Sequence, residues 1–120
     1  LAVGCAGGPR IITSVLQMII NTLEYGRMME PAVRTPFMCC LTKEQGLELE
    51  DGFSPDTIAL LEKKGHKVIV PPNVGVMSCM PNGIMYRDGL FYPAGTNRVD
   101  GGGGVLTQDG SIGIDGLCFK

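Results

Sequence analysis

The residues best suited to chemistry stand near the start of the chain, in a glycine-rich run that leads into an apolar segment. The run covers residues 4–10 and reads GCAGGPR. Adjacent glycines leave backbone N–H groups open to a ligand, and the first N–H groups of a helix lack intrahelical partners at the positive end of its dipole. Pro9 suits a first helical position. The pattern predicts a site for an anion or an oxyanion at Gly7 and Gly8.

Two other interpretations fit the same spacing. The glycines suit a tight turn between a strand and a helix that binds nothing. A phosphate-binding module built from Gly4 to Pro9 is the third possibility, but the run lacks the Lys and the Ser or Thr of a P-loop. Spacing alone leaves the turn and the oxyanion site open.

Nucleophilic side chains near the run have no activating partners in sequence. Thr13 and Ser14 are expected to be ordinary polar positions of a helix. Cys5 has no adjacent His or carboxylate, so we expect it to be a small packing residue. His66, the single histidine, follows a helix-ending glycine and is expected to be structural. We therefore expect no nucleophile in this segment.

No metal or cofactor is predicted. Four acidic residues lack metal-ligand spacing and are expected on a solvated face: Glu48, Glu50, Asp51 and Asp56. Arg10 is likewise expected to be a solvated residue at a helix start. Five cysteines with one histidine argue against zinc, and we expect mostly buried or free thiols, with Cys118 the most exposed.

Length and charge exclude several classes of protein. A chain of 120 residues fits one domain. The net charge of −2, with ten scattered Lys and Arg, argues against nucleic-acid binding. The longest apolar stretch, residues 11–23, is too short and too polar to span a membrane. Because the chain starts at Leu1 with no signal-like leader, we expect it to be cut from a longer protein.

The first half of the chain predicts helices between short strands. Leu1 to Val3 is expected to end a buried strand. In the helix that follows, residues 12, 15, 16, 19 and 23 keep helical spacing, and Ile11, Met18 and Ile20 widen the apolar stripe. The helix is therefore expected to pack on two sides, as an inner helix of a larger sandwich does. Capping and helix-ending residues predict three helices: Pro9–Tyr25 before Gly26, Met29–Arg34, and Pro55–Lys64 between Ser54 and Gly65. The buried face of the third helix is expected to carry Ile58 and Leu61. A loop, Leu41–Gly46, and a short strand, Leu47–Leu49, are expected between the second and third helices.

The second half predicts short strands. These are expected at residues 68–70, 74–80, 84–87 and 90–92, separated by Pro71-Pro72, Pro81-Asn82-Gly83 and a hairpin turn at Asp88-Gly89. The glycines at 101–104 suggest a flexible joint, followed by a hairpin of 105–107 with 112–114 about Asp109-Gly110. A helix pair followed by mostly antiparallel strands indicates an α+β fold.

Motifs along nearly the whole chain resemble the γ-glutamyltransferase family, in the C-terminal part of its light subunit. They are the glycine run and its helix, residues 30–36 (EPAVRTP), residues 52–57 (GFSPDT), residues 60–68 (LLEKKGHKV), and residues 94–101 (AGTNRVDG). The motifs occur in family order from Val3 to about Gly104. Pro9 and residues 37–40 (FMCC) depart from the family pattern, and the tail after Val105 goes past the family's usual end.

The resemblance implies part of the four-layer αββα sandwich of N-terminal-nucleophile hydrolases. It implies that residues 1–120 form a single C-terminal segment of the light subunit, with 101–120 as joint and tail. It also implies a reaction, transfer or hydrolysis of the γ-glutamyl group of glutathione and related amides through a γ-glutamyl-Thr intermediate. Gly7 and Gly8 would be the backbone oxyanion donors, and Arg98 would pair with Asp100.

The family's nucleophilic Thr and its substrate-gripping residues belong upstream of Leu1. This segment alone is therefore expected to be inactive, and its expected partners are the rest of the light subunit, the heavy subunit, the γ-glutamyl substrate and an acceptor. An extracellular or periplasmic location follows from the resemblance alone. The alternative is a non-catalytic light-chain-only relative that acts as a binding or structural module.

Overall fold

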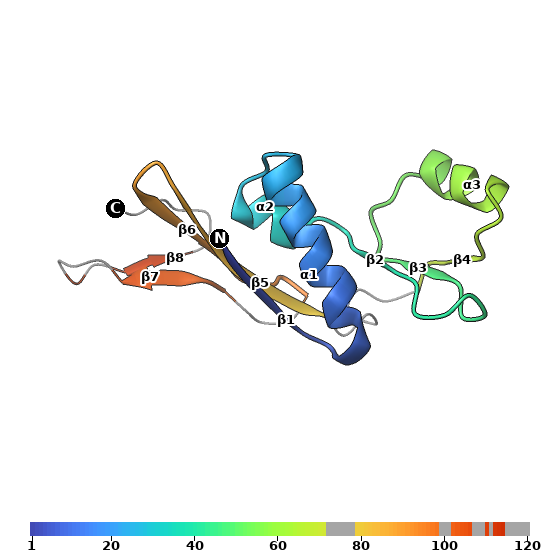
Figure 1. Cartoon of the computed structure of the whole chain (residues 1–120), viewed down its shortest axis with the longest axis horizontal. Coiled ribbons are helices and arrows are strands. Elements are labelled where there is room, and N and C mark those ends of the chain that lie inside the picture. Colours follow the sequence, from blue (N-terminus) through green and yellow to red (C-terminus); the bar gives the residue numbers. More distant parts are fainter. Residues whose placement is uncertain (72–78, 99–101, 107–109, 111, 115–120) are drawn as a thin grey trace.

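The computed structural model describes residues 1–71, 79–98, 102–106, 110 and 112–114. The expected strand at 74–80 therefore lies largely outside the described residues. The molecule is elongated, with extents of 54 × 26 × 22 Å. A larger part, in which helices cover a sheet, lies beside a smaller part that contains α3 (Figure 1).

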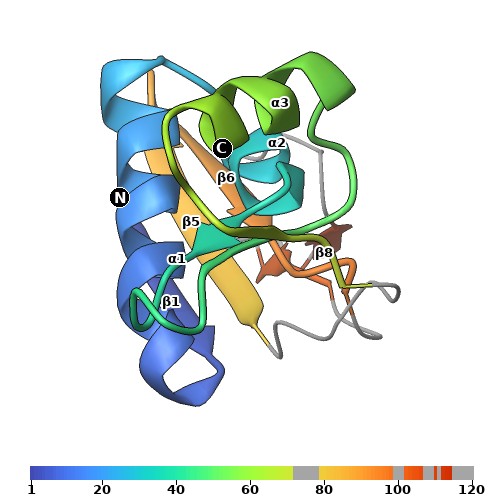
Figure 2. The same ribbon diagram turned by 90° about the vertical axis from the view of Figure 1, so that its right-hand side faces the viewer.

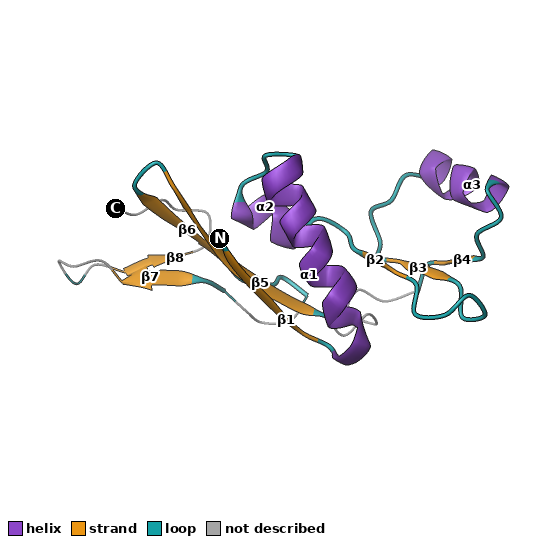
Figure 3. Ribbon diagram, viewed as in Figure 1, coloured by secondary structure: helices purple, strands orange, loops and turns teal. Residues whose placement is uncertain are grey.

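The larger part packs two helices on one face of a three-stranded antiparallel sheet (Figures 1 and 3). The strand order is β1 (Ala2–Ala6), β5 (Met80–Arg87), β6 (Leu90–Ala94), and the helices are α1 (Ile11–Ile19) and α2 (Met29–Arg34). Buried apolar residues of these elements and of neighbouring segments form the core: Met18, Met29, Ala32, Val33, Phe37, Cys39, Cys79, Met85 and Ala94. The expected helix Met29–Arg34 is confirmed, with Thr35 as its C-cap.

The first helical segment runs from residue 8 to residue 24, close to the expected Pro9–Tyr25. It comprises a 3₁₀ turn (Gly8–Arg10), α1 and a π-helical turn (Ile20–Glu24), and Gly26 follows with a φ of 65°. Ile12, Leu16 and Leu23 are 75%, 53% and 68% exposed in this chain, so the expected packing of a second side of the helix stays a prediction.

The buried positions of this helical segment are Ser14, Met18 and Thr22. The hydroxyl oxygens of Ser14 and Thr22 lie 2.9 and 2.8 Å from the carbonyl oxygens four residues earlier. Bonded in this way, a small hydroxyl side chain can be buried without an unpaired polar group. The helix therefore packs on one side only within the described part of the chain.

The smaller part is built around a second sheet of order β2-β3-β4. Its elements are β2 (Met38–Cys39), β3 (Leu47–Leu49), α3 (Pro55–Lys63) and β4 (Val68–Ile69). β3 and β4 pair in parallel, with α3 as the crossover between them (Figure 2). The Ser54 cap is confirmed, because its side chain accepts a hydrogen bond from the Thr57 N–H. Ile58 and Leu61 are only half-buried, which corrects the expectation of a buried face.

Residues 81–83 do not separate two strands, as the sequence had indicated, but lie inside β5. Pro81 is opposite Cys5 of β1, and pairing with β6 begins only at Gly83, so the missing N–H of Pro81 faces no ladder partner on the β6 side. A Cβ on Gly83 would lie 2.7 Å from Met29 Sδ, so the glycine lets α2 approach the sheet.

Both predicted hairpins are present. Asp88 and Gly89 have φ values of 52° and 81°, the left-handed pair that a two-residue hairpin turn needs between β5 and β6. β7 (Gly104–Leu106) pairs antiparallel with β8 (Ile112–Ile114), so Gly104, expected in a flexible joint, begins a strand. None of the helices formed by the described residues is long and apolar enough to cross a membrane.

Candidate oxyanion site

The glycine turn joins the end of β1 to the start of the first helical segment. β1 continues to Ala6 and is only partly covered, so the expectation of a buried strand ending at Val3 is wrong. Gly7 has φ 142° and ψ 28°, and Gly8 has a φ of 61°. Residues other than glycine rarely adopt either backbone conformation, so the bend depends on glycine at both positions.

Gly8 is required by its conformation and not by crowding. A Cβ at Gly8 would meet no atom within 4 Å, and the same is true at Gly4, four residues earlier in β1. Gly8 is exposed and Gly7 half-buried. The two peptide groups are thus accessible from outside the chain at the N-terminal end of a helix, where a backbone donor pair can bind an anion or an oxyanion.

Local hydrogen bonds hold the turn in place. Pro9 lies in the 3₁₀ turn, as expected, and the Ile11 N–H donates to the Gly8 carbonyl oxygen. The Thr13 hydroxyl oxygen lies 3.1 Å from the Arg10 carbonyl oxygen, and the Ser14 hydroxyl oxygen lies 2.9 Å from it. Both hydroxyls therefore serve the helix start, which agrees with their expected structural role.

Arg10 is paired and not solvated, contrary to expectation. Its Nε and Nη2 atoms donate to the two carboxylate oxygens of Glu48 on β3, each at 3.0 Å. The two side chains are 23% and 22% exposed. This bidentate pair joins the glycine turn to the second sheet. Because Glu48 balances the charge of Arg10, the backbone dipoles are the main source of positive potential at Gly7 and Gly8.

A second ion pair, which is nearly buried, holds the two sheets together. Arg98 Nε and Nη2 lie 2.6 and 2.5 Å from the carboxylate oxygens of Glu50, and the side chains are 4% and 8% exposed. The guanidinium also donates to the carbonyl oxygens of Val33 and Thr35, at 2.8 and 3.0 Å. Four of the five guanidinium N–H groups thus have acceptors among the described residues.

These contacts correct two expectations. Glu50 is not on a solvated face, since it is buried and also accepts a hydrogen bond from the Phe37 N–H at 2.7 Å. Arg98 does form a buried ion pair, but with Glu50. Asp100, its expected partner, lies outside the described residues. The Arg98 guanidinium also stacks on the Phe37 ring, 4.4 Å from its centroid.

Cys5, in the turn's approach strand, lies close to the buried Cys79. Burial raises the pKa of the Cys79 thiol, the Ser14 hydroxyl at 3.1 Å lowers it, and the neighbouring Cys5 thiol raises it further. Cys5, Cys39, Cys40 and Cys79 are all free thiols. Cys118 lies outside the described residues. The sequence held no signal for the Ser14–Cys79 contact, because the two residues are far apart in the chain.

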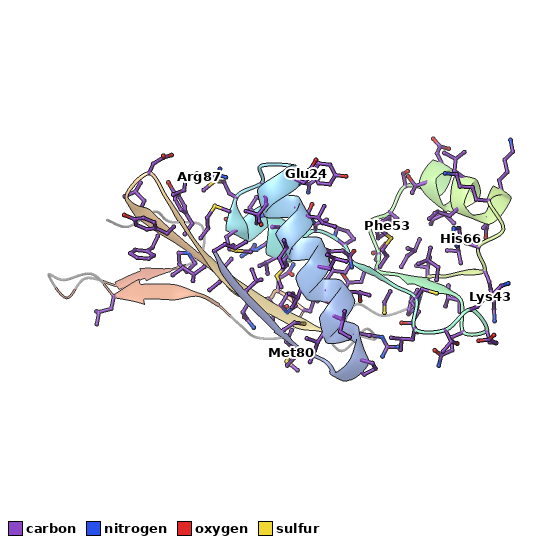
Figure 4. The ribbon with its side chains drawn as sticks, viewed as in Figure 1. Glu24, Lys43, Phe53, His66, Met80 and Arg87 are labelled. Atoms are coloured by element: carbon purple, nitrogen blue, oxygen red, sulfur yellow. The ribbon has the colours of Figure 1, made fainter. Side chains whose placement is uncertain are left out.

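His66 lies in the smaller part, far along the molecule from the glycine turn (Figure 4). It is exposed and follows Gly65, which has a φ of 91°. Together with Lys43, Lys64 and Lys67 it lines an open hollow of about 600 Å³. The expected structural role of His66 stays a prediction.

Sequence reasoning missed the role of Gln17. Its side-chain amide donates to the Met38 carbonyl oxygen at 2.8 Å and accepts from the Met38 N–H at 3.0 Å. Gln17 thereby supplies β2 with the hydrogen bonds that another strand would supply at its open edge. The sequence signal for this role was a glutamine within a largely apolar helix.

Known proteins match most of the chain. The family model described as Gamma-glutamyltranspeptidase matches residues 1–105. The glutathione hydrolase proenzyme of Escherichia coli (strain K12) is 43% identical over 98 residues, which cover 82% of this chain and 16% of that protein. The acylase ACY 1 proenzyme of Pseudomonas sp. (strain V22) is 34% identical over 102 residues, covering 83% and 17%. The chain thus spans about one sixth of these relatives' length.

Solved structures agree with these matches. The chain is similar to the γ-glutamyltranspeptidase T380A mutant of Helicobacter pylori, with a TM-score of 0.66 and 27% identity over 81% of this chain and 53% of that one. The helix-covered sheet accordingly forms part of the αββα sandwich of N-terminal-nucleophile hydrolases, and the α+β expectation is confirmed. From its family match, its sequence relatives and its fold, this chain belongs to the γ-glutamyltranspeptidase family.

Proposed function

We propose that the chain is the C-terminal part of the light subunit of a γ-glutamyltransferase-like enzyme. The enzyme would transfer or hydrolyse the γ-glutamyl group of glutathione and related amides through a γ-glutamyl-Thr intermediate. Gly7 and Gly8 would donate their backbone N–H groups to the oxyanion of the tetrahedral intermediate. The observation that carries the proposal is their pair of positive φ angles, which places two accessible peptide groups at a helix start.

Membership in a longer protein is supported by the match to relatives of about five times this chain's length. The nucleophilic Thr and the residues that grip the substrate would come from upstream segments. Thr13 and Ser14 are engaged with the Arg10 carbonyl oxygen, which supports a nucleophile from outside this segment. The segment alone would then be inactive, with the rest of the light subunit and the heavy subunit as partners, in a periplasmic or extracellular setting.

The first test is the mature N-terminus of the natural light chain, read by mass spectrometry. The proposal expects a chain that starts at a Thr upstream of Leu1. A mature chain that starts at Leu1, or just before it, and does not hydrolyse γ-glutamyl-p-nitroanilide would refute it. That result would favour the alternative, a light-chain-only relative that acts by binding or as a structural module.

Two glycine variants of the assembled enzyme test the oxyanion role. Gly8→Ala adds a methyl group into open space but disfavours the φ of 61° that orients the peptide group. Loss of one oxyanion donor costs about 10²–10³ in kcat, so Gly8→Ala should lower kcat toward that range with a smaller effect on KM. Gly4→Ala is the matched control, because its methyl group is equally unobstructed and lies in an ordinary strand.

Equal kcat values for the two variants would refute the oxyanion assignment while leaving the family intact. The acylase relative gives a second candidate substrate class, amides other than γ-glutamyl amides, in the same kind of reaction. An acyl group released from such an amide, with no hydrolysis of γ-glutamyl-p-nitroanilide, would favour that reading.

A further inference from the structure

Two cysteines that are distant in sequence share one face of the larger sheet. Cys5 on β1 is directly opposite Pro81 on β5. Side chains alternate along a strand, so Cys79, two residues before Pro81, follows on the same face as Cys5. Diagonal neighbours of this kind across an antiparallel pair are within reach of each other's side chains.

The burial of the two thiols differs, although both contact the same core. Cys79 is 1% exposed and belongs to the buried cluster, whereas Cys5 is half-buried and packs against that cluster from its edge. The Cys5 thiol interacts with Cys79 directly enough to raise the pKa of Cys79. The Ser14 hydroxyl, 3.1 Å from Cys79 Sγ, is the third polar group at this place.

We propose that Cys5 and Cys79 form a redox-active pair, whose disulfide joins β1 to the segment that enters β5. The oxidant is a small-molecule disulfide, of which oxidised glutathione is the probe used below. The proposal rests on strand register and burial, and it does not depend on the proposed function.

The reaction proceeds by two thiol–disulfide exchanges. The Cys5 thiolate attacks the small disulfide, a mixed disulfide forms at Cys5, and one small-molecule thiol leaves with the proton lost by Cys5. The Cys79 thiolate then attacks Cys5 Sγ, the intramolecular disulfide forms, and the second small-molecule thiol leaves with the proton from Cys79. The protein pair is oxidised by two electrons and the small disulfide is reduced by two.

The difference in burial sets the order of the two exchanges. A small disulfide meets the half-buried Cys5 first, because Cys79 is enclosed by the core. The Ser14 oxygen lies 3.1 Å from Cys79 Sγ, so its hydroxyl can turn from the Arg10 carbonyl oxygen and donate to the Cys79 thiolate, which makes Ser14 a positioning residue for the second exchange. The finished bond would fix the end of β1 two residues before Gly7.

Peptide mapping tests the pair in the full chain. The folded chain is treated with oxidised glutathione, its remaining thiols are alkylated, and it is digested with trypsin. Cleavage after Lys and Arg separates the cysteines into distinct peptides: Cys5 in residues 1–10, Cys39 and Cys40 in 35–43, Cys79 in 68–87 and Cys118 in 99–120. We expect the main cross-linked species to join 1–10 with 68–87.

Variants and unfolding provide the controls. Cys40→Ser removes an exposed thiol and should leave the 1–10/68–87 link unchanged, whereas Cys79→Ser should abolish the link and leave glutathione on Cys5. Ser14→Ala should slow the second exchange, so that the mixed disulfide at Cys5 persists longer. In strong denaturant the same oxidation should give mixed pairings, since the selectivity comes from the fold.

Three outcomes would overturn the proposal. They are a stable mixed disulfide at Cys5 in the folded parent chain with no transfer to Cys79, a dominant link from either cysteine to Cys39, Cys40 or Cys118, and the same pairing pattern in the folded and the unfolded chain.

Discussion

Replacing Arg98 by Met should destabilise the chain more than any other change to a charged side chain described above. The substitution removes the cation and leaves the Glu50 carboxylate 8% exposed, with the Phe37 N–H as its remaining donor among the described residues. The carbonyl oxygens of Val33 and Thr35 lose a donor as well. Breaking a buried pair by removing one partner costs about 3–5 kcal/mol, because the remaining charge is buried without compensation.

The matched control is Arg34→Met. Arg34 pairs with Glu30 at 3.3 Å, but these side chains are 45% and 35% exposed. An exposed pair one helical turn apart contributes about 0.3–0.5 kcal/mol, so the control should be nearly neutral. The comparison thus holds the residue types constant and varies the burial.

Urea unfolding followed by far-UV circular dichroism measures both variants. With a denaturant slope of about 1–3 kcal/mol per molar urea, Arg98→Met should lower the midpoint by about 1–5 M. A free energy of unfolding within about 1 kcal/mol of the Arg34→Met value would refute the reasoning, because it would put Arg98 in the range of surface pairs. The double variant Glu50→Gln/Arg98→Met should lose less than the sum of its parts, since no lone charge is left buried.

Three further changes test other contacts. Gly83→Ala places a Cβ 2.7 Å from Met29 Sδ and should cost about 1–3 kcal/mol by overpacking, which urea unfolding would detect; no change in stability would mean that α2 moves away freely. Gln17→Ala leaves both backbone groups of Met38 without their side-chain partner at an exposed edge and should cost about 0.5–1.5 kcal/mol in the same assay, whereas a neutral result would show that water replaces the amide fully. The Cys79 thiol holds its proton to higher pH when folded, because burial raises its pKa, so the folded chain binds more protons above pH 9.0 and its unfolding free energy should fall as the pH rises from there. Cys79→Ala should flatten that dependence, and an unchanged slope would contradict it.

Elements that depend on short-range signals were predictable from the sequence. The Ser54 cap, the Asp88-Gly89 turn and the end of α2 before Pro36 each depend on the conformational preferences of a few adjacent residues. The structure has all three where the sequence puts them. The glycine turn belongs to this group as well, since its two glycines and Pro9 act locally.

Features that depend on distant partners were not predictable. The sequence predicts a solvated carboxylate at Glu50, because its partner, Arg98, lies 48 residues later in the chain. Pro81 reads as a strand breaker until β6 is known to start its pairing two residues further on. The buried face of the first helical segment was unpredictable for a related reason. Ser14 and Thr22 are buried there because their hydroxyls bond to their own helix, which hydrophobic spacing does not reveal.

The pairing of β1 with β5 determines when the glycine turn can be placed against the sheet during synthesis. Ala6 pairs with Met80 and Ala2 with Ile84, so the partner strand is made 74 to 82 residues later. At about 5–20 residues per second, β1 leaves the ribosome roughly 4–16 s before β5 exists. The hairpin of β5 and β6 and the α3 crossover close much shorter loops and can form without β1. The placement of Gly7 and Gly8 against the sheet is therefore among the last features of the described fold to become fixed, although the bend itself is held by local contacts.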